Sequence, residues 1–484
     1  MLAVVLLCSP SFGEQAPTEQ KPVTPDQNPV TTEQKPVTSE QNPVITDQKP
    51  VTIEDLQRRI NELEVKQAEL IQQMQSQHPG DVLQPAPEKP AEKKPGEEKM
   101  PVQSTVKVDL YGYIKLDAAW DQARIDQGNY ARWVLSEDGR ENDSQFNMTA
   151  NQTRIGLKFR GPDVGPAQTS GLIEMDFYGG GSENKPNPML RKAYAVVSWP
   201  DLDLSILGGQ DIDTISPLVA ETINYTVLWW VGNIGYRRPQ LRVTKGFGLG
   251  GDFRLELQAA AARAVGRVAL FNNKDFSPGD SGEDSGFPTA QGRIALTFPF
   301  VGPTPATVGV SGHYGQEELD YDAENGHVTL DSWSVNFDAT MPVTKWLRIK
   351  GEGFAGADLD VYLGGIGQGV TIIKGTVPNP APPPDTLEVL DRAYEVHSYG
   401  GWLIANVGPF GDWNFNAGAA ADNPENSDLV AGDRTLNYTY FGNFLVKVYQ
   451  TTQFGLEVSW WRTDYKQKEA GDSLRVQATM IFNF

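Results

Sequence analysis

Apolar and polar residues alternate along one segment after another from Val106 to Phe484. In the segment 106–120 every even position is Val, Leu, Gly, Ile, Ala or Trp, whereas most odd positions are charged residues or tyrosine. Successive side chains of a β-strand point to opposite faces, so such a segment predicts a strand with one apolar and one polar face. The pattern returns near 155–159, 173–177, 253–259, 333–339, 347–349, 438–448 and 474–484. We therefore expect an all-β fold for the last four-fifths of the chain.

The connections between these segments alternate between short and long. Short ones fall near 161–167, 200–202, 245–250, 299–305, 341–345, 408–411 and 450–452. Long ones fall near 121–146, 179–188, 210–235, 272–290, 316–327, 356–391, 421–435 and 463–472. Seven short and eight long connections join sixteen strands, and sorting of loop lengths by end is typical of outer-membrane barrels, whose closure leaves no edge strand. The sequence thus predicts a sixteen-stranded antiparallel transmembrane barrel over residues 105–484, embedded in a lipid bilayer.

Large aromatic residues occur near the ends of the predicted strands, where the two membrane–water interfaces would lie. They are Trp120, Phe159, Trp199, Phe298, Trp346, Phe410, Trp413 and Phe484. A barrel of sixteen strands encloses water rather than a packed core, so its charged face would point inward. The alternative is a soluble β-sandwich in which these aromatics form the core.

The first hundred residues predict no globular domain. Residues 1–13 contain a short apolar run and small residues, as in a secretory signal peptide, although the usual basic start is missing. Residues 14–51 repeat Pro-Val-Thr every seven residues, which forbids a continuous helix and predicts a disordered spacer. Residues 79–104 form a second linker rich in Pro, Lys and Glu.

Between these two linkers, residues 52–78 predict an amphipathic helix. Its apolar residues recur at alternating steps of three and four, which is the seam of a coiled coil. The seam residues are Ile53, Leu56, Ile60, Leu63, Leu70 and Met74. We expect a short oligomerising coiled coil, and the alternative is a marginally stable solvated helix.

The composition narrows the classes of function. A net charge of −21 argues against nucleic acid as a partner. One cysteine and four scattered histidines give no metal-ligand spacing, so we predict no metal site and no cofactor. The pattern Gly246-x-Gly248-x-x-Gly251 falls between two alternating segments and not before a helix, which favours a turn over a dinucleotide site. We accordingly predict that the protein is not an enzyme.

Four short segments follow one another along the chain: Tyr111-Gly-Tyr-Ile-Lys-Leu-Asp117, Thr153-Arg-Ile-Gly-Leu-Lys-Phe-Arg-Gly161, Gly208-Gly-Gln210 and Arg238-Pro-Gln-Leu-Arg242. In this order and spacing they resemble the DcaP-type porins of Gram-negative outer membranes. The terminal Phe484 looks like the signal that the barrel-assembly machinery reads. The resemblance implies a homotrimer of sixteen-stranded barrels that conducts small hydrophilic, often anionic, solutes. It also implies that residues 52–78 form a trimeric coiled coil in the periplasm. The long heptad spacer and the insertion 227–233 depart from that pattern.

We expect charged residues at a constriction to determine which solutes pass. The long connection 210–235 is the best candidate for an inward loop, and the strands near it are rich in arginine. The predicted constriction residues are Lys115, Arg154, Lys158, Asp211, Asp213, Glu221, Arg237, Arg238 and Arg242. Arginines facing acids would orient dipolar or anionic solutes; alternatively these arginines only pair with interior acids and hold the loop.

The sequence therefore predicts an outer-membrane diffusion porin, with its N-terminal region in the periplasm. One alternative is a substrate-specific channel of the eighteen-strand type. Another is a structural envelope protein whose barrel is plugged and whose spacer binds peptidoglycan. A secreted β hydrolase is the third.

Overall fold

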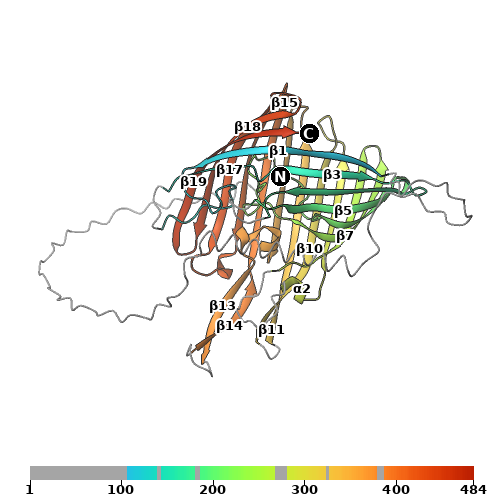
Figure 1. The fold of residues 1–484 in the computed structure, drawn as a ribbon. Helices are drawn as coiled ribbons and strands as arrows, with labels where there is room; N and C mark the ends of the chain where they lie inside the picture. The colour runs from blue at the N-terminus through green and yellow to red at the C-terminus, as the bar shows by residue number, and fades with distance from the viewer. Residues whose placement is uncertain (1–105, 139–142, 180–185, 267–280, 323–325, 379–385) are drawn as a thin grey trace, which may run out of the picture. The chain divides into compact units, whose positions relative to one another are not determined.

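The computed structural model describes residues 106–138, 143–179, 186–266, 281–322, 326–378 and 386–484 (Figure 1). The signal peptide, the spacer, the coiled coil and the linker predicted for residues 1–104 lie outside this part of the chain.

Long antiparallel strands form the wall of a closed barrel (Figure 1). The strands of its first half are β1 (Lys107–Asp121), β2 (Gln145–Thr149), β3 (Arg154–Arg160), β4 (Gln168–Asp176), β5 (Met189–Trp199), β6 (Leu204–Ile212), β7 (Arg237–Gly250), β8 (Phe253–Ala262) and β9 (Thr289–Phe298). Those of its second half are β10 (Ala306–Asp322), β11 (Gly326–Pro342), β12 (Leu347–Ala357), β15 (His397–Phe410), β16 (Trp413–Pro424), β17 (Arg434–Lys447), β18 (Thr452–Tyr465) and β19 (Lys468–Asn483).

The ring closes between its first and last strands. Nine residue pairs join β1 to β19, from Tyr113↔Asn483 to Asp121↔Arg475. The other edge of β1 pairs with β2 and then with β3, which are two parts of one wall strand interrupted at 150–153. Counting β2 and β3 as one gives sixteen wall strands, which confirms the predicted barrel.

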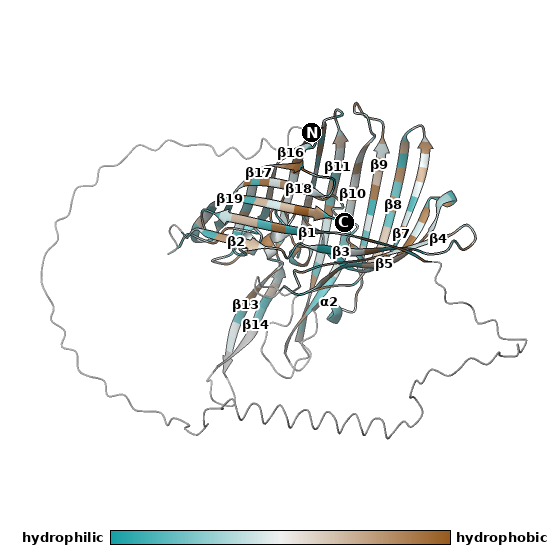
Figure 2. Ribbon diagram, turned by 45° about the horizontal axis from the view of Figure 1, so that its top comes forward, coloured by the Kyte–Doolittle hydropathy of each residue, from teal (hydrophilic) through white to brown (hydrophobic). Residues whose placement is uncertain are grey.

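Burial in the wall is the reverse of that in a soluble protein. On β11, Trp333, Val335 and Phe337 are exposed, whereas Ser334 and Asn336 between them are buried. The same alternation of brown and teal runs along the other strands (Figure 2). Closure removes the sheet edges, and the pleat then sends every second side chain outward. The apolar face of the sequence pattern is therefore the outer surface, and the polar face lines the interior.

All seven connections that are predicted to be short are short in the structure, as expected for one end of the barrel. For two connections, the prediction of a long loop is wrong. β10 continues to Asp322 before β11 begins at Gly326, and β18 continues to Tyr465 before β19 begins at Lys468. The many charged and polar residues at these tips suggested loops, but backbone pairing extends past the apolar band into both of them.

The predicted loop 356–391 contains a hairpin that the alternation did not reveal. Strand β13 (Val370–Pro378) pairs with β14 (Thr386–Glu395) in a separate two-stranded sheet. The remaining described elements are short: η1 (Pro200–Leu202), α2 (Ser281–Asp284), η2 (Asp360–Tyr362), η3 (Gly365–Gly367) and η4 (Asn426–Asp428). Among the described residues, no helix has the length and apolar character needed to cross a membrane.

Candidate functional site

Two neighbouring strands, β6 and β7, bring predicted acids and arginines together. The guanidinium of Arg242 lies 2.6 Å from Asp211 Oδ2. The other oxygen of Asp211 is 3.0 Å from the ammonium of Lys192, on β5. Asp211 therefore has two cationic partners, of which Arg242 is a predicted constriction residue and Lys192 is not.

A second pair lies where these strands end. Arg238 Nε is 2.8 Å from Asp213 Oδ1, and both side chains are almost completely buried. The guanidinium also lies 3.9 Å from the centre of the Tyr362 ring, which stacks on His313. Arg238 therefore joins the end of β6 to the segment that follows β12.

Arg237 is buried as well, but it lies against rings. Its guanidinium carbon is 4.5 Å from the centre of the Tyr236 ring and 5.6 Å from that of Trp229. Pro239 and Leu241, which share its phase along the strand, are exposed on the outer face. At the strand end, Arg237 is instead covered by aromatic residues, a position that alternation did not predict.

The three predicted cations of β1 and β3 have different surroundings. Lys115 is buried, with its ammonium 3.3 Å from Asp117 and 3.1 Å from the carbonyl of Ile223. Arg154 is 3.7 Å from Glu174. Lys158 is exposed and lies 4.6 Å from the centre of the Tyr111 ring. The nine predicted residues thus do not form one cluster.

The segment 213–236, which leaves β6 and returns to β7, contacts strands far around the ring. The amide of Ile223 donates a 2.7 Å hydrogen bond to Glu457 on β18, and the amide of Leu218 donates one of 2.7 Å to Glu352 on β12. Its Glu221 pairs with Lys350, also on β12. In the ring order, these strands lie across the barrel from β6.

Two apolar clusters join this segment to others. The first combines residues of 122–134 and 220–231 with side chains of β15 to β18, and its members are Ala123, Ile125, Ala131, Val134, Ala220, Leu228, Val231, Trp402, Ile404, Ala420, Phe441 and Trp461. The second contains Ile215, Ile234, Phe354, Leu359 and Tyr362. The segments that connect the strands therefore pack together with side chains of the wall strands in two hydrophobic cores.

A cation–aromatic stack lies beside the first cluster. Arg132 donates a 2.6 Å hydrogen bond to Asp126, and its guanidinium lies 4.2 Å from the Trp133 ring and 5.0 Å from the Trp230 ring. Burial raises the pKa of Asp126, and the attraction of Arg132 only partly opposes this. The amide of Trp230 donates a 2.7 Å hydrogen bond to the carbonyl of Leu363. These contacts connect the segments 122–134, 213–236 and 358–369.

Arg191 is an interior residue that sequence reasoning missed. It donates hydrogen bonds of 2.9 Å to Glu174 and 2.7 Å to Asp176. The register between β4 and β5 shifts at Glu174 and Met175, which changes the phase of this part of β5. Such an irregularity re-aims side chains, and no single-strand periodicity reveals it.

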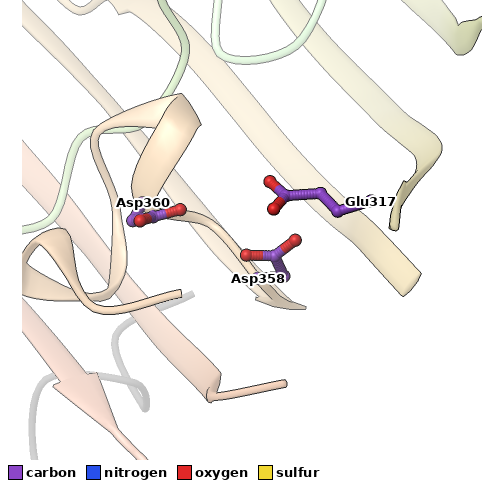
Figure 3. Close-up of side chains that lie close together, drawn as sticks. All are labelled: Glu317, Asp358 and Asp360. Atoms are coloured by element: carbon purple, nitrogen blue, oxygen red, sulfur yellow. The ribbon is translucent and has the colours of Figure 1, made fainter. Parts of the chain in front are cut away.

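Three carboxylates lie together near the start of the segment 358–369. Glu317 comes from β10, and Asp358 and Asp360 follow β12 (Figure 3). Their oxygen atoms lie within 4.8 Å of one another. Glu317 and Asp358 are buried and Asp360 is half-buried, but a cluster of acids is not by itself a metal site, so this geometry alone assigns no metal.

The comparisons identify the fold. No family model and no curated protein matches this chain. The outer membrane channel DcaP of Acinetobacter baumannii superposes with a TM-score of 0.57 and 16% identity, covering 78% of this chain and 97% of the channel. An anion-selective porin from Comamonas acidovorans gives a TM-score of 0.49 and 11% identity over 78% of this chain and all of that one. The chain therefore has the barrel fold of the DcaP channel.

Proposed function

We propose that the protein is an outer-membrane diffusion porin for small hydrophilic solutes. The observation that supports this most directly is the sixteen-stranded closed ring with exposed apolar residues outside and charged residues inside. Such a surface is stable only in lipid, and a charged interior of this size is stable only when it meets water. The barrel fold shared with a known outer membrane channel agrees with this function.

The segment 213–236 is the proposed constriction. Its hydrogen bonds to Glu457 and Glu352 reach strands opposite its own, so it would narrow the lumen rather than extend over the rim. On the side of β1 to β7, Lys158, Lys192 and Arg242 would give the remaining passage a positive wall. A fixed charge acts more strongly in a narrow, low-dielectric passage than in bulk water. We infer a preference for anions.

Planar-bilayer recording tests both statements. The wild-type protein should give stable ionic currents. In a salt gradient, its reversal potential should have the sign expected of an anion-selective channel. Replacing Arg237, Arg238 and Arg242 together with Gln should shift that potential toward cations. An unchanged potential would remove these arginines from selectivity, and liposome swelling with neutral and charged sugars would then show which solutes pass.

The trimer and its periplasmic coiled coil also belong to the proposal. Deleting residues 52–78 should lower the temperature at which trimers dissociate in mild detergent, because the predicted seam from Ile53 to Met74 would be lost. A variant with Ile60 and Leu63 changed to Ala tests the same seam without shortening the chain. Unchanged trimer stability in both variants would reduce this region to a spacer.

A plugged structural barrel is the second candidate, and the two apolar clusters favour it. They fill part of the interior with side chains from three connecting segments. Bilayers that contain the inserted protein and carry no current would support this function, with the spacer binding peptidoglycan. The eighteen-strand architecture is wrong for this chain, because the described strands close a ring of sixteen.

A further inference from the structure

Four arginines in the described part of the chain are buried: Arg237, Arg238, Arg293 and Arg475. Three of them have an aspartate partner. Arg238 pairs with Asp213 at 2.8 Å, Arg293 with Asp338 at 2.6 Å, and Arg475 with Asp121 at 2.9 Å. Arg237 pairs with no carboxylate of the described residues, although only 7% of it is exposed.

Both terminal nitrogens of Arg237, Nη1 and Nη2, are inaccessible to solvent and lack a hydrogen-bond acceptor among the described residues. A buried ionised group without an acceptor costs several kcal/mol in general, so native proteins rarely leave one unmatched. Ring contacts with Tyr236 and Trp229 supply part of the compensation, but a ring face offers no acceptor for four N–H groups.

The other groups around Arg237 are already matched or uncharged. Burial raises the pKa of Tyr225, so its hydroxyl is neutral at physiological pH. The carboxylate of Asp176, which acts on Tyr225 electrostatically, pairs with Arg191 at 2.7 Å. Asp213 pairs with the neighbouring Arg238. Among the residues that the structure describes, no nearby acid is therefore left to balance the positive charge of Arg237.

The rings themselves form a continuous set. The ring centres of Tyr178 and Tyr225 are 3.8 Å apart, with the rings tilted by 30°. The ring centre of Trp229 lies 6.4 Å from that of Tyr225 and 5.6 Å from that of Tyr236. Val227, Leu228 and Trp230, on both sides of Trp229, have positive φ angles of 46°, 71° and 65°. This backbone conformation is uncommon outside glycine and often marks functional segments.

We propose that Arg237 is an anion-binding site that accepts one carboxylate group of a passing solute. The two terminal nitrogens match the two oxygens of a carboxylate in a planar, bidentate arrangement. Trp229 and Tyr236 would move aside to admit the carboxylate and would then cover its apolar part. This inference deepens the proposed function, because the anion would reach the site from the lumen.

Binding can be measured without any conductance, through tryptophan emission of the purified, detergent-solubilised protein. Acetate replaces chloride at constant ionic strength, and acetamide, its neutral isostere, is the parallel titrant. The difference between wild type and Trp229→Phe isolates the reporter among the other tryptophans. We expect a saturable change with acetate and none with acetamide.

Three variants separate binding from packing. Arg237→Gln should weaken apparent acetate binding about tenfold or more, because two charge-assisted hydrogen bonds are lost. Arg237→Lys keeps the charge but not the planar pair of donors, so it should also weaken binding. Arg254→Gln removes a partly exposed arginine that pairs with Asp203 near the start of β8, and this variant should bind like wild type. If Arg237→Gln does not fold, the Arg237→Lys titration and acetate-dependent melting of wild type remain decisive.

An acetate response that is equal in wild type and Arg237→Gln, or that is matched by acetamide, would overturn the site. So would the absence of any saturable response. Saturable binding in a protein that carries no current would leave the site standing and remove the diffusion function. Ionic currents without saturable acetate binding would overturn the site and leave the diffusion function standing.

Discussion

The carboxylate of Glu457 on β18 accepts a 2.7 Å hydrogen bond from the backbone amide of Ile223. The partner residues are 234 positions apart in sequence, and this bond ties the middle of the segment 213–236 to the far wall. Thr222 and Asn443 donate to the same carboxylate, so one acid holds three donors.

Replacing Glu457 with Ala should release the middle of this segment. Charge-assisted hydrogen bonds contribute about 1.5–3 kcal/mol each, and water replaces part of them, so we expect a loss of about 2–3 kcal/mol in the free energy of unfolding. Single-channel recordings should show larger and noisier currents. Glu457→Gln keeps one acceptor oxygen, so its stability and its currents should lie between those of wild type and Glu457→Ala. Quiet, wild-type currents in Glu457→Ala would mean that other contacts fix the segment.

The Arg238–Asp213 pair can be measured by a double-mutant cycle. Removing one partner of a buried ion pair leaves the other unmatched and costs about 3–5 kcal/mol. We expect such losses for Arg238→Gln and for Asp213→Asn in denaturant unfolding, and a double variant that is more stable than the sum of the two losses implies. Strict additivity would show that the two charges do not interact.

Asp126 should make the cation–aromatic stack of Arg132 with Trp133 and Trp230 sensitive to pH. Burial raises the pKa of its carboxyl above the usual value for aspartate, so the folded chain takes up this proton at a higher pH than the unfolded chain does. Above the folded-state pKa, the ionised carboxylate therefore lowers the free energy of unfolding. This loss of stability disappears as the pH falls through the folded-state pKa. Tryptophan emission should change in this step, because Arg132 lies over Trp133 and Trp230.

The matched control for this titration is Asp126→Asn. It should show no step and should be at least as stable as wild type at neutral pH. A step that persists in Asp126→Asn would assign the titration to another group.

Deleting Phe484 should impair closure of the barrel. Its amide and its carbonyl each form a 3.1 Å hydrogen bond with Gly112 on β1, so it extends the pairing of the closing seam. The deletion should lower the yield of folded barrel, seen as less heat-modifiable protein on a gel. Phe484→Ala keeps both backbone bonds and loses only the ring, so a defect as large as that of the deletion would assign the effect to the assembly signal.

The wall of the barrel could be predicted from sequence because each strand carries its own two-residue period. Val335 and Asn336 show on which face they lie without any knowledge of neighbouring strands. The hairpin of β13 and β14 was not predicted, because its residues lie outside the ring and alternate weakly.

The partners of the interior charges could not be predicted in the same way. Glu457 meets Ile223 only because a connecting segment packs against the opposite wall, and Arg191 reaches Asp176 only because the register shifts beside it. Arg237 follows the phase of outer-face residues and is nevertheless buried. These positions depend on contacts between distant segments, which a local period does not encode.

The first apolar cluster lies against β15 to β18, and the second lies beside β12. Water and ions avoid such apolar surfaces. A solute that crosses this barrel would therefore travel off-centre, along the wall built by the first half of the strands. Substitutions of interior residues on β1 to β9 should then alter permeation directly, whereas substitutions on the later strands should alter it only by loosening the packed half.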